Sequence, residues 1–270
     1  MTRPRTGFPF LDHGLDQPGS VLAFAHRGGA FHPEIEGLEN TMAAFEHAVD
    51  LGFEYLETDV HVTRDGALLA FHDAVLDRVT RHKGAIADLR YSDVAEALIG
   101  GREQIPTMSA LFERFPDARF NIDLKSDAAV APLADLVASF GAQDRVCVGS
   151  FSRRRTNRFR SLAGDRVATA AAPLDVVAFR FLPTTRLVDV LTRDRAALQV
   201  PHRHRGLTIV TPKLIARAHE LGKPVHVWTV DDPAEMRHLL DLGVDGLMTD
   251  RTDLLREVLV ERGQWSGATR

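Results

Sequence analysis

The sequence DLGFEYLETD at residues 50–59 recurs in modified form at residues 241–250, which read DLGVDGLMTD. Each string holds a Leu-Gly pair that stops a helix and then a short apolar run, as where a helix leads directly into a strand. A third Leu-Gly stop, at Leu221-Gly222, also precedes an apolar run. The recurrence predicts a chain built from repeated helix-to-strand units.

Short apolar runs alternate with amphipathic helical patterns from about residue 20 onward. Eight of these runs are strand candidates: Val21–Ala25, Tyr55–Val62, Phe120–Leu124, Arg145–Ser150, Arg166–Ala171, Ala197–Val200, Val225–Val230 and Gly246–Thr249. Eight strands alternating with helices imply an α/β fold with a parallel sheet. A chain of 270 residues suits one closed (β/α)₈ TIM barrel, which needs roughly 250. An open doubly wound sheet is the alternative.

The expected barrel is a single domain, because no low-complexity linker divides the chain. We place it at residues 20–262, after an N-terminal arm or barrel plug (1–19) and before a C-terminal tail (263–270). A further short strand at Ala67–Phe71 is expected to pair with the second barrel strand through the turn at Asp65-Gly66.

Two helices carry boundary signals. Asn40 is expected to cap a helix that Gly52 ends, and Asp232-Pro233 to begin a helix that Gly243 ends.

The bulk composition narrows the class of protein. The formal net charge of −4 argues against a surface that tracks nucleic acid. Cys147 is the only cysteine and lies in an apolar run, which excludes an intrachain disulfide and favours a buried thiol.

Residues 1–18 lack the apolar core of a signal peptide, and no apolar stretch approaches the roughly 20 residues of a membrane span. We therefore expect a cytoplasmic protein, monomeric or homodimeric, without stable membrane insertion.

The chemistry is expected where the strands end, because the active site of a TIM barrel lies at the C-terminal ends of its strands. The first strand runs into His26-Arg27-Gly28-Gly29, which places a proton carrier, a cation and exposed backbone amides at one rim position. A polar strand end with a tight turn is the structural alternative.

Carboxylates follow on the next strands. Glu57 and Asp59 are two residues apart, so both side chains point to the barrel interior, where they need a cation. Asp123 and Lys125 share one face of the third strand in the same way. A metal held by Glu57, Asp59 and Asp123 would have only oxygen ligands, which favours Mg²⁺ or Ca²⁺. An ion pair with Arg27 or Lys125 is the alternative for these carboxylates.

The ordered set of motifs resembles the glycerophosphodiester phosphodiesterase family. The resemblance rests on His26-Arg27-Gly28, Glu39-Asn40-Thr41, Glu57-x-Asp59, Thr63-x-Asp65-Gly66, His72-Asp73, Ile122-Asp123-Leu124-Lys125, Ser150-Phe151 and Val227-Trp228-Thr229-Val230. It implies a barrel enzyme with two catalytic histidines, His26 and His72, and one carboxylate-bound divalent metal. Such an enzyme uses water to cleave glycerophosphodiesters to glycerol 3-phosphate and an alcohol. Arg27 and Lys125 are then expected to hold phosphate oxygens, and Trp228 to face the substrate.

The sequence departs from the family pattern at three places. Leu38 stands where a proline is common, and the stretch Ala30–Gly37 is longer than in many members. Asp123 stands where a glutamate is more usual, and its shorter side chain leaves room for a water molecule between Asp123 and a metal.

Other interpretations remain open at this point. A related phosphodiesterase acting on a phospholipid or lysophospholipid would reuse the same site but favours an exposed apolar rim, and the sequence shows no strong apolar loop. A non-catalytic barrel that binds a phosphate metabolite is a rival from another class. The arginine-rich run 153–160 could attract anionic lipid or nucleic acid, although such runs are more often the solvated face of a helix. The loop 201–205 has a surface role or recognises the leaving alcohol.

Overall fold

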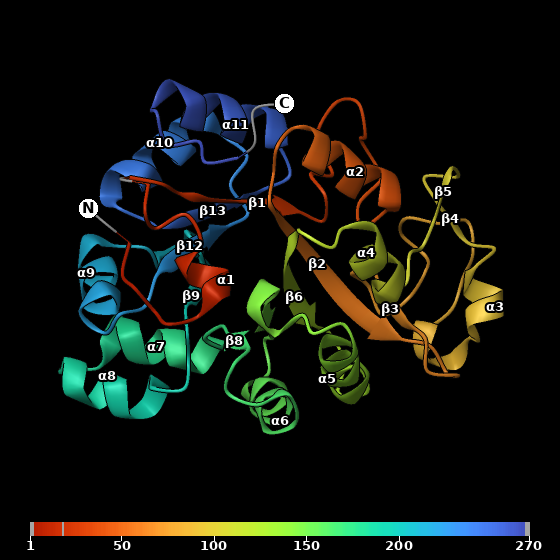
Figure 1. Cartoon of the computed structure of the whole chain (residues 1–270), viewed down its shortest axis with the longest axis horizontal. Helices are drawn as coiled ribbons and strands as arrows, with labels where there is room; N and C mark the ends of the chain where they lie inside the picture. Colours follow the sequence, from red (N-terminus) through yellow and green to blue (C-terminus); the bar gives the residue numbers. More distant parts are fainter. Residues whose placement is uncertain (1–2, 18, 268–270) are drawn as a thin grey trace.

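The computed structural model describes residues 3–17 and 19–267. Its central element is a ring of parallel strands, each formed by one of the apolar runs. The strands are β1 (Leu22–His26), β2 (Tyr55–Val62), β6 (Arg119–Leu124), β7 (Val146–Gly149), β8 (Ala168–Thr169), β9 (Leu198–Pro201), β12 (Val225–Trp228) and β13 (Gly246–Thr249). Each pairs with its neighbour in chain order, and β1 pairs with β13. The bridge between Ala170 and Ala197 joins β8 to β9 and closes the ring. The predicted TIM barrel is therefore confirmed (Figure 1).

The repeated string explains part of this closure. Residues 50–59 lead into β2 and residues 241–250 into β13, and these strands pair with β1 on its two sides. The two helix-to-strand joints thus flank the first strand of the barrel. Asp59 and Asp250, the last residues of the two strings, both reach the C-terminal end of the barrel.

Helices surround the ring and bury one apolar face each against it (Figure 1). They are α2 (Met42–Asp50), α4 (Met108–Arg114), α5 (Val130–Ser139), α6 (Arg153–Ala163), α7 (Pro173–Phe181), α8 (Thr185–Thr192), α9 (Pro212–Glu220), α10 (Pro233–Leu242) and α11 (Thr252–Glu261).

The boundary signals of α10 are confirmed: the Asp232 side chain accepts a hydrogen bond from the Glu235 amide, and Gly243 is left-handed. The predicted cap of α2 is wrong, because Thr41 caps it through the Ala44 amide. Asn40 is left-handed instead, with φ of 57°.

The N-terminal arm closes the bottom of the barrel. Its short helix α1 (Pro9–Asp12) lies across the centre of the ring in Figure 1. Phe10 and Leu11 are buried, and the Phe10 ring lies 5.2 Å from that of Tyr55. The Tyr55 hydroxyl donates a hydrogen bond of 2.7 Å to the Phe10 carbonyl. Residues 1, 2 and 18 of the arm, and residues 268–270 of the tail, lie outside the described residues.

The segment after β2 is larger than the single extra strand expected from the sequence. The antiparallel strand β3 (Leu68–Ala70) is present, with Val60 opposite Ala70. It is followed by η1 (Ile86–Asp88), α3 (Tyr91–Val94), β4 (Leu98–Ile99) and β5 (Glu103–Gln104), at the right of Figure 1. These pieces bury an apolar cluster of their own. They are too short to show a periodic pattern in the sequence.

Candidate active site

A cavity of about 540 Å³ opens at the C-terminal ends of the barrel strands. All eight candidate residues from the sequence line it: His26, Arg27, Glu57, Asp59, His72, Asp123, Lys125 and Trp228. They come from β1, β2, β6 and β12 and from the segment after β3. Closure of the barrel therefore brings into one cavity residues that lie up to about two hundred positions apart in the chain.

The turn after β1 needs glycine for two reasons. Gly28 and Gly29 have φ of 86° and 88°, and they follow Arg27, which is also left-handed at 51°. A Cβ on Gly28 would lie 2.7 Å from the Ala44 Cβ and 2.9 Å from its backbone carbon. The close approach of this turn to α2 fixes where His26 and Arg27 stand.

Gly28→Ala is therefore expected to lower the free energy of unfolding by about 2–4 kcal/mol, from the left-handed backbone and the overlap with α2 together. Gly37→Ala is the matched control, because its φ is 80° but nothing lies within 4 Å of the added Cβ. It should cost only about 1 kcal/mol in urea unfolding. Equal losses in the two variants would show that packing against α2 contributes nothing.

His26 is held between two carboxylates. Its Nδ1 lies 2.9 Å from Asp250 Oδ1, and its Nε2 lies 3.8 Å from Glu57 Oε2. Burial alone would lower the pKa of His26, but the charge of Glu57 and the hydrogen bond with Asp250 outweigh it and raise the pKa to about 9. Asp250 was missed from the sequence. The alignment of the two strings, which sets Asp250 against Asp59, is the signal that could have found it.

Asp59 is buried and has ion pairs on both of its oxygens. Lys125 Nζ lies 2.8 Å from Oδ1, and Arg27 Nε lies 3.2 Å from Oδ2. The Asn40 amide donates to the same Oδ2 at 3.3 Å. Burial would raise the pKa of Asp59, but Lys125 and Arg27 hold it below its usual value. The ion-pair alternative considered for this carboxylate is thus present in the structure.

Glu57 is compensated less well, although the charges of His26 and Arg27 lie near it. Burial and the neighbouring charge of Asp59 raise the pKa of Glu57 to about 7. Its Oε2 accepts a hydrogen bond of 3.2 Å from the Arg27 amide. Glu57 is the carboxylate of the cavity whose negative charge is least well balanced.

Asp123 lies directly opposite Asp59 in the register between β2 and β6. Lys125 Nζ donates a hydrogen bond of 2.7 Å to Asp123 Oδ2, so one ammonium group bridges both carboxylates. Burial nevertheless raises the pKa of Asp123, and Lys125 offsets this only in part.

A chain of ion pairs connects His72 to Arg27. Its Nδ1 lies 2.6 Å from Asp73 Oδ1, and Arg78 Nε donates to Asp73 Oδ2 at 2.6 Å. Arg78 also binds both oxygens of Glu39, which pairs with Arg27. The sequence did not single out Arg78. His61 is buried, and its Nε2 lies 3.1 Å from the His72 carbonyl oxygen.

The donor chemistry of the three carboxylates fits a hard divalent cation. No hydrogen bond within the described part of the chain uses Glu57 Oε1 or Asp123 Oδ1. As the side chains stand, no group of three or more His, Cys, Asp or Glu residues in ranges 3–17 and 19–267 is arranged to hold a metal. Lys125 occupies the position between Asp59 and Asp123 instead.

One side of the cavity is apolar. The Trp228 ring meets that of Phe151 edge-on at 5.8 Å, and Val176, Val177 and Ile209 complete this wall. Phe151 is 64% exposed and Val177 51% exposed. The rim therefore has an apolar side, although the sequence shows no strong apolar loop. The apolar residues belong to different βα connections, so no single stretch of sequence reveals them.

Residues 26–254 match the profile of one protein family, described as the glycerophosphoryl diester phosphodiesterase family. The chain belongs to this family. The "probable glycerophosphodiester phosphodiesterase 2" of Mycobacterium tuberculosis is 40% identical over 96% of each chain. A lysophospholipase D of Rattus norvegicus is 27% identical over 87% of this chain and 85% of its own length.

Among solved structures, the glycerophosphodiester phosphodiesterase of Agrobacterium tumefaciens superposes on this phosphodiesterase with a TM-score of 0.71. The two are 27% identical, and the alignment covers 87% of this chain and 99% of the other. The family expected from the motifs is confirmed.

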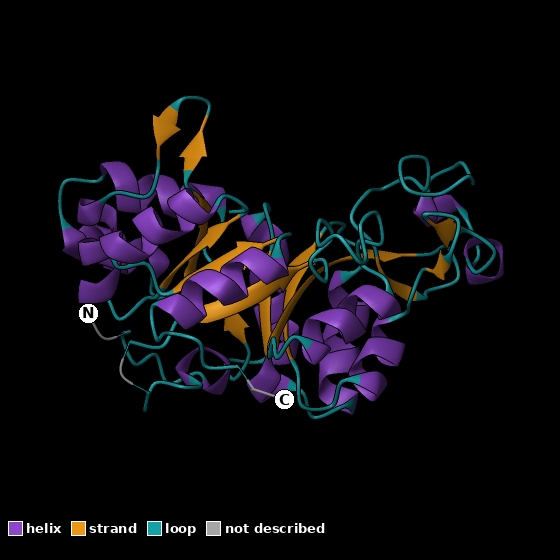
Figure 2. Cartoon of the chain, turned by 90° about the horizontal axis from the view of Figure 1, so that it is seen from above, coloured by secondary structure: helices purple, strands orange, loops and turns teal. Residues whose placement is uncertain are grey.

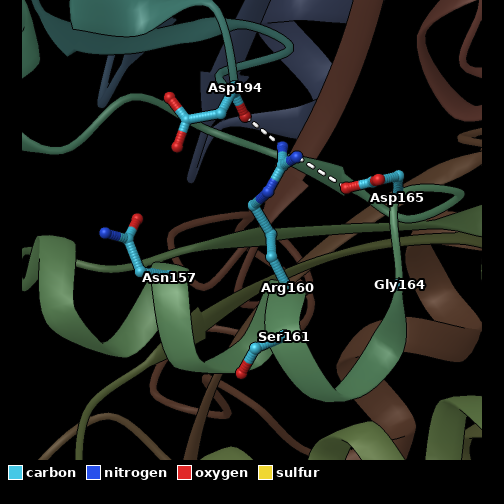
Figure 3. Close-up of a pocket in the computed structure, with 6 residues that line it drawn as sticks. All are labelled: Asn157, Arg160, Ser161, Gly164, Asp165 and Asp194. Carbon is cyan, nitrogen blue, oxygen red and sulfur yellow. Dashed lines mark hydrogen bonds and ion pairs between the residues drawn. The ribbon is translucent and has the colours of Figure 1, made fainter.

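A second depression of this phosphodiesterase lies at the opposite end of the barrel. Asn157, Arg160, Ser161, Gly164, Asp165 and Asp194 line it (Figure 3). The Arg160 guanidinium donates to the Asp165 carboxylate and to the Asp194 carbonyl, so its cation is already paired. Because catalytic groups of such barrels gather at the other end, this depression is not a candidate active site.

Proposed function

We propose that this protein hydrolyses glycerophosphodiesters to glycerol 3-phosphate and an alcohol, using one divalent metal ion and the imidazoles of His26 and His72. The observation that carries the proposal is the single cavity lined by both histidines, three carboxylates and two cations at the C-terminal end of the barrel. Family membership supports the reaction class.

Each histidine has one ring nitrogen bound to a carboxylate, which fixes the ring and leaves the other nitrogen for proton transfer. Asp250 does this for His26 and Asp73 for His72. In the reaction a nucleophilic oxygen forms a bond to phosphorus and gives its proton to one imidazole. The bond from phosphorus to the leaving oxygen breaks, and the other imidazole protonates that oxygen.

Arg27 and Lys125 supply fixed positive charge for the phosphate oxygens. In the cavity these two cations face three carboxylates, and both of them pair with Asp59. Glu57 is balanced by the imidazole of His26, whose raised pKa favours the cation. A bound divalent ion would balance the carboxylates directly and leave Arg27 and Lys125 for the anionic phosphodiester, which is the electrostatic argument for a metal.

Glu57, Asp59 and Asp123 would hold the metal, and Mg²⁺ or Ca²⁺ suits their hard oxygens. When bound, the ion supplies charge neutralisation at the phosphoryl group. Lys125 can then turn from the carboxylates toward the substrate. This step needs only rotation of the lysine side chain about its flexible stem.

Asp123→Asn is expected to weaken metal binding by about tenfold or more, because one of three negative donors is lost. Raising the metal concentration should recover part of the lost rate. Asp123→Glu, which restores the more usual residue of the family, should keep metal affinity near that of the wild type. Metal titration followed by calorimetry and by activity checks both variants. Unchanged affinity in Asp123→Asn would mean that Asp123 only pairs with Lys125.

A second candidate substrate is a lysophospholipid. The exposed apolar wall at Phe151 and Val177 favours it, and the relative from Rattus norvegicus carries a name of that class. Products from glycerophosphocholine, glycerophosphoethanolamine and lysophosphatidylcholine, measured with and without chelator, test the two candidates. Hydrolysis of none of the three, with glycerol 3-phosphate still bound, would indicate a non-catalytic binding barrel.

A further inference from the structure

The rim of the barrel is chemically divided. Apart from His204, the ionisable groups of the cavity come from the ends of β1, β2 and β6 and from the insertion beside them. The connections after β7, β8 and β9 instead present apolar side chains to solvent. These connections hold Phe151, helix α7 and the hairpin of β10 (Arg203–His204) and β11 (Leu207–Thr208). All three border the cavity through Phe151, Val177 and Ile209.

Helix α7 is apolar on two faces. Ala178 and Phe179 lie on the buried face. Leu174, Val177 and Phe181, spaced as one helical stripe, are 70%, 51% and 58% exposed. With α8, this helix carries six of the fifteen exposed large apolar side chains found in the described chain. A helix that only packs on a barrel needs one apolar stripe, so the second indicates a contact outside the molecule.

Exposed arginines stand on the connections that precede and follow this stripe in the chain. Arg203 and Arg205 are exposed on the hairpin, which projects beyond the helices in Figure 2. His204, between them, lines the cavity. Arg154 is exposed at the start of α6, three residues after Phe151. Within residues 3–17 and 19–267 none of these three arginines forms an ion pair, whereas the half-buried Arg153, Arg155 and Arg160 of α6 each pair with an aspartate.

We propose that Phe151, Leu174, Val177, Phe181, Arg203 and Arg205, the docking rim, bind reversibly to an anionic phospholipid surface. Apolar side chains enter the boundary between headgroups and acyl chains, and arginines around them are attracted by anionic headgroups. Docking in this orientation places the cavity mouth against the lipid. No helix of the described residues is long and apolar enough to cross a membrane.

The arginines of the docking rim favour an anionic lipid surface over the other partners that an apolar face could bind. A second copy of this chain would bring the same arginines against one another, and like charges at a contact are unfavourable. An uncharged hydrocarbon ligand gives no reason for cations that project beyond the cavity. An anionic surface satisfies the apolar stripe and the arginines together.

Co-sedimentation with large vesicles of phosphatidylcholine, alone or mixed equally with phosphatidylglycerol, tests the proposal. The wild type should bind the anionic vesicles about 25-fold better, and salt should reduce the difference. Arg203→Glu with Arg205→Glu should lower partitioning by about 25-fold, roughly fivefold for each arginine. Leu174→Ser with Phe181→Ser should lower it by about tenfold or more. Val260→Ser, which changes an equally exposed residue of α11, is the control and should bind like the wild type.

Equal binding to both vesicle types, or equal loss in the Val260→Ser control, would overturn the proposal. A second outcome would also overturn it. In that outcome the wild type does not bind vesicles and is a dimer by light scattering, and Leu174→Ser with Phe181→Ser converts the dimer to a monomer. Hydrolysis of soluble glycerophosphocholine is followed in the same samples and tests the proposed function separately. Full hydrolysis without vesicle binding refutes the docking rim alone, whereas vesicle binding without hydrolysis supports it and refutes the proposed function.

Discussion

His26→Ala is expected to lower kcat by about 10²–10⁴-fold, because an imidazole that transfers a proton in the transition state contributes that much. His26 is held by Asp250 and faces Glu57, so its ring is fixed in the cavity. His72→Ala should lower kcat by a similar factor, because the second proton transfer of the reaction is then lost. Steady-state kinetics on glycerophosphocholine and glycerophosphoethanolamine measure both.

His219→Ala is the matched control for this prediction. His219 also forms a short pair with an aspartate, 2.7 Å to Asp245, and its side chain is 17% exposed against 14% for His26. Asp245 precedes β13, so this pair lies at the opposite end of the barrel. Loss of this pair should lower the free energy of unfolding and leave kcat within about twofold of the wild-type value. A His26→Ala protein with near-normal turnover, or equal loss of turnover in His219→Ala, would contradict the two-histidine mechanism.

Removal of divalent metal is expected to reduce activity by about 10³-fold or more, since a metal at a phosphoryl group is worth several kcal/mol. Mg²⁺ or Ca²⁺ should restore it. The physical reason is the balance of charge, with the carboxylates of Glu57, Asp59 and Asp123 outnumbering Arg27 and Lys125. Activity after chelation, with the metal content determined by elemental analysis, checks the prediction.

A second measurement does not depend on turnover. Metal at about 100 times its dissociation constant should stabilise the folded protein by about 2.7 kcal/mol and raise the thermal unfolding temperature. Glu57→Gln should remove most of this stabilisation, whereas Glu261→Gln, a change in an exposed ion pair far from the cavity, should not. Full activity in a sample shown to be free of metal would refute the metal proposal.

Much of the fold could be predicted because it depends on local patterns. Each barrel strand is a short apolar run, and the Leu-Gly pairs mark where a helix ends before the next strand begins. The extent of the insertion could not be predicted in this way. Its elements are two to four residues long, and their apolar cluster forms only when they fold over one another.

The sequence by itself determined which residue types stand at the strand ends. Since the carboxyl ends of parallel strands meet at one edge, His26, Glu57, Asp59, Asp123 and Lys125 had to share a cavity once the barrel closed. Tertiary structure alone decided their partners. His26 meets Asp250 across 224 residues of chain, and Lys125 bridges Asp59 and Asp123. It also decided which apolar stripe of α7 faces solvent, because helical periodicity identifies a stripe but only packing selects the one that is buried.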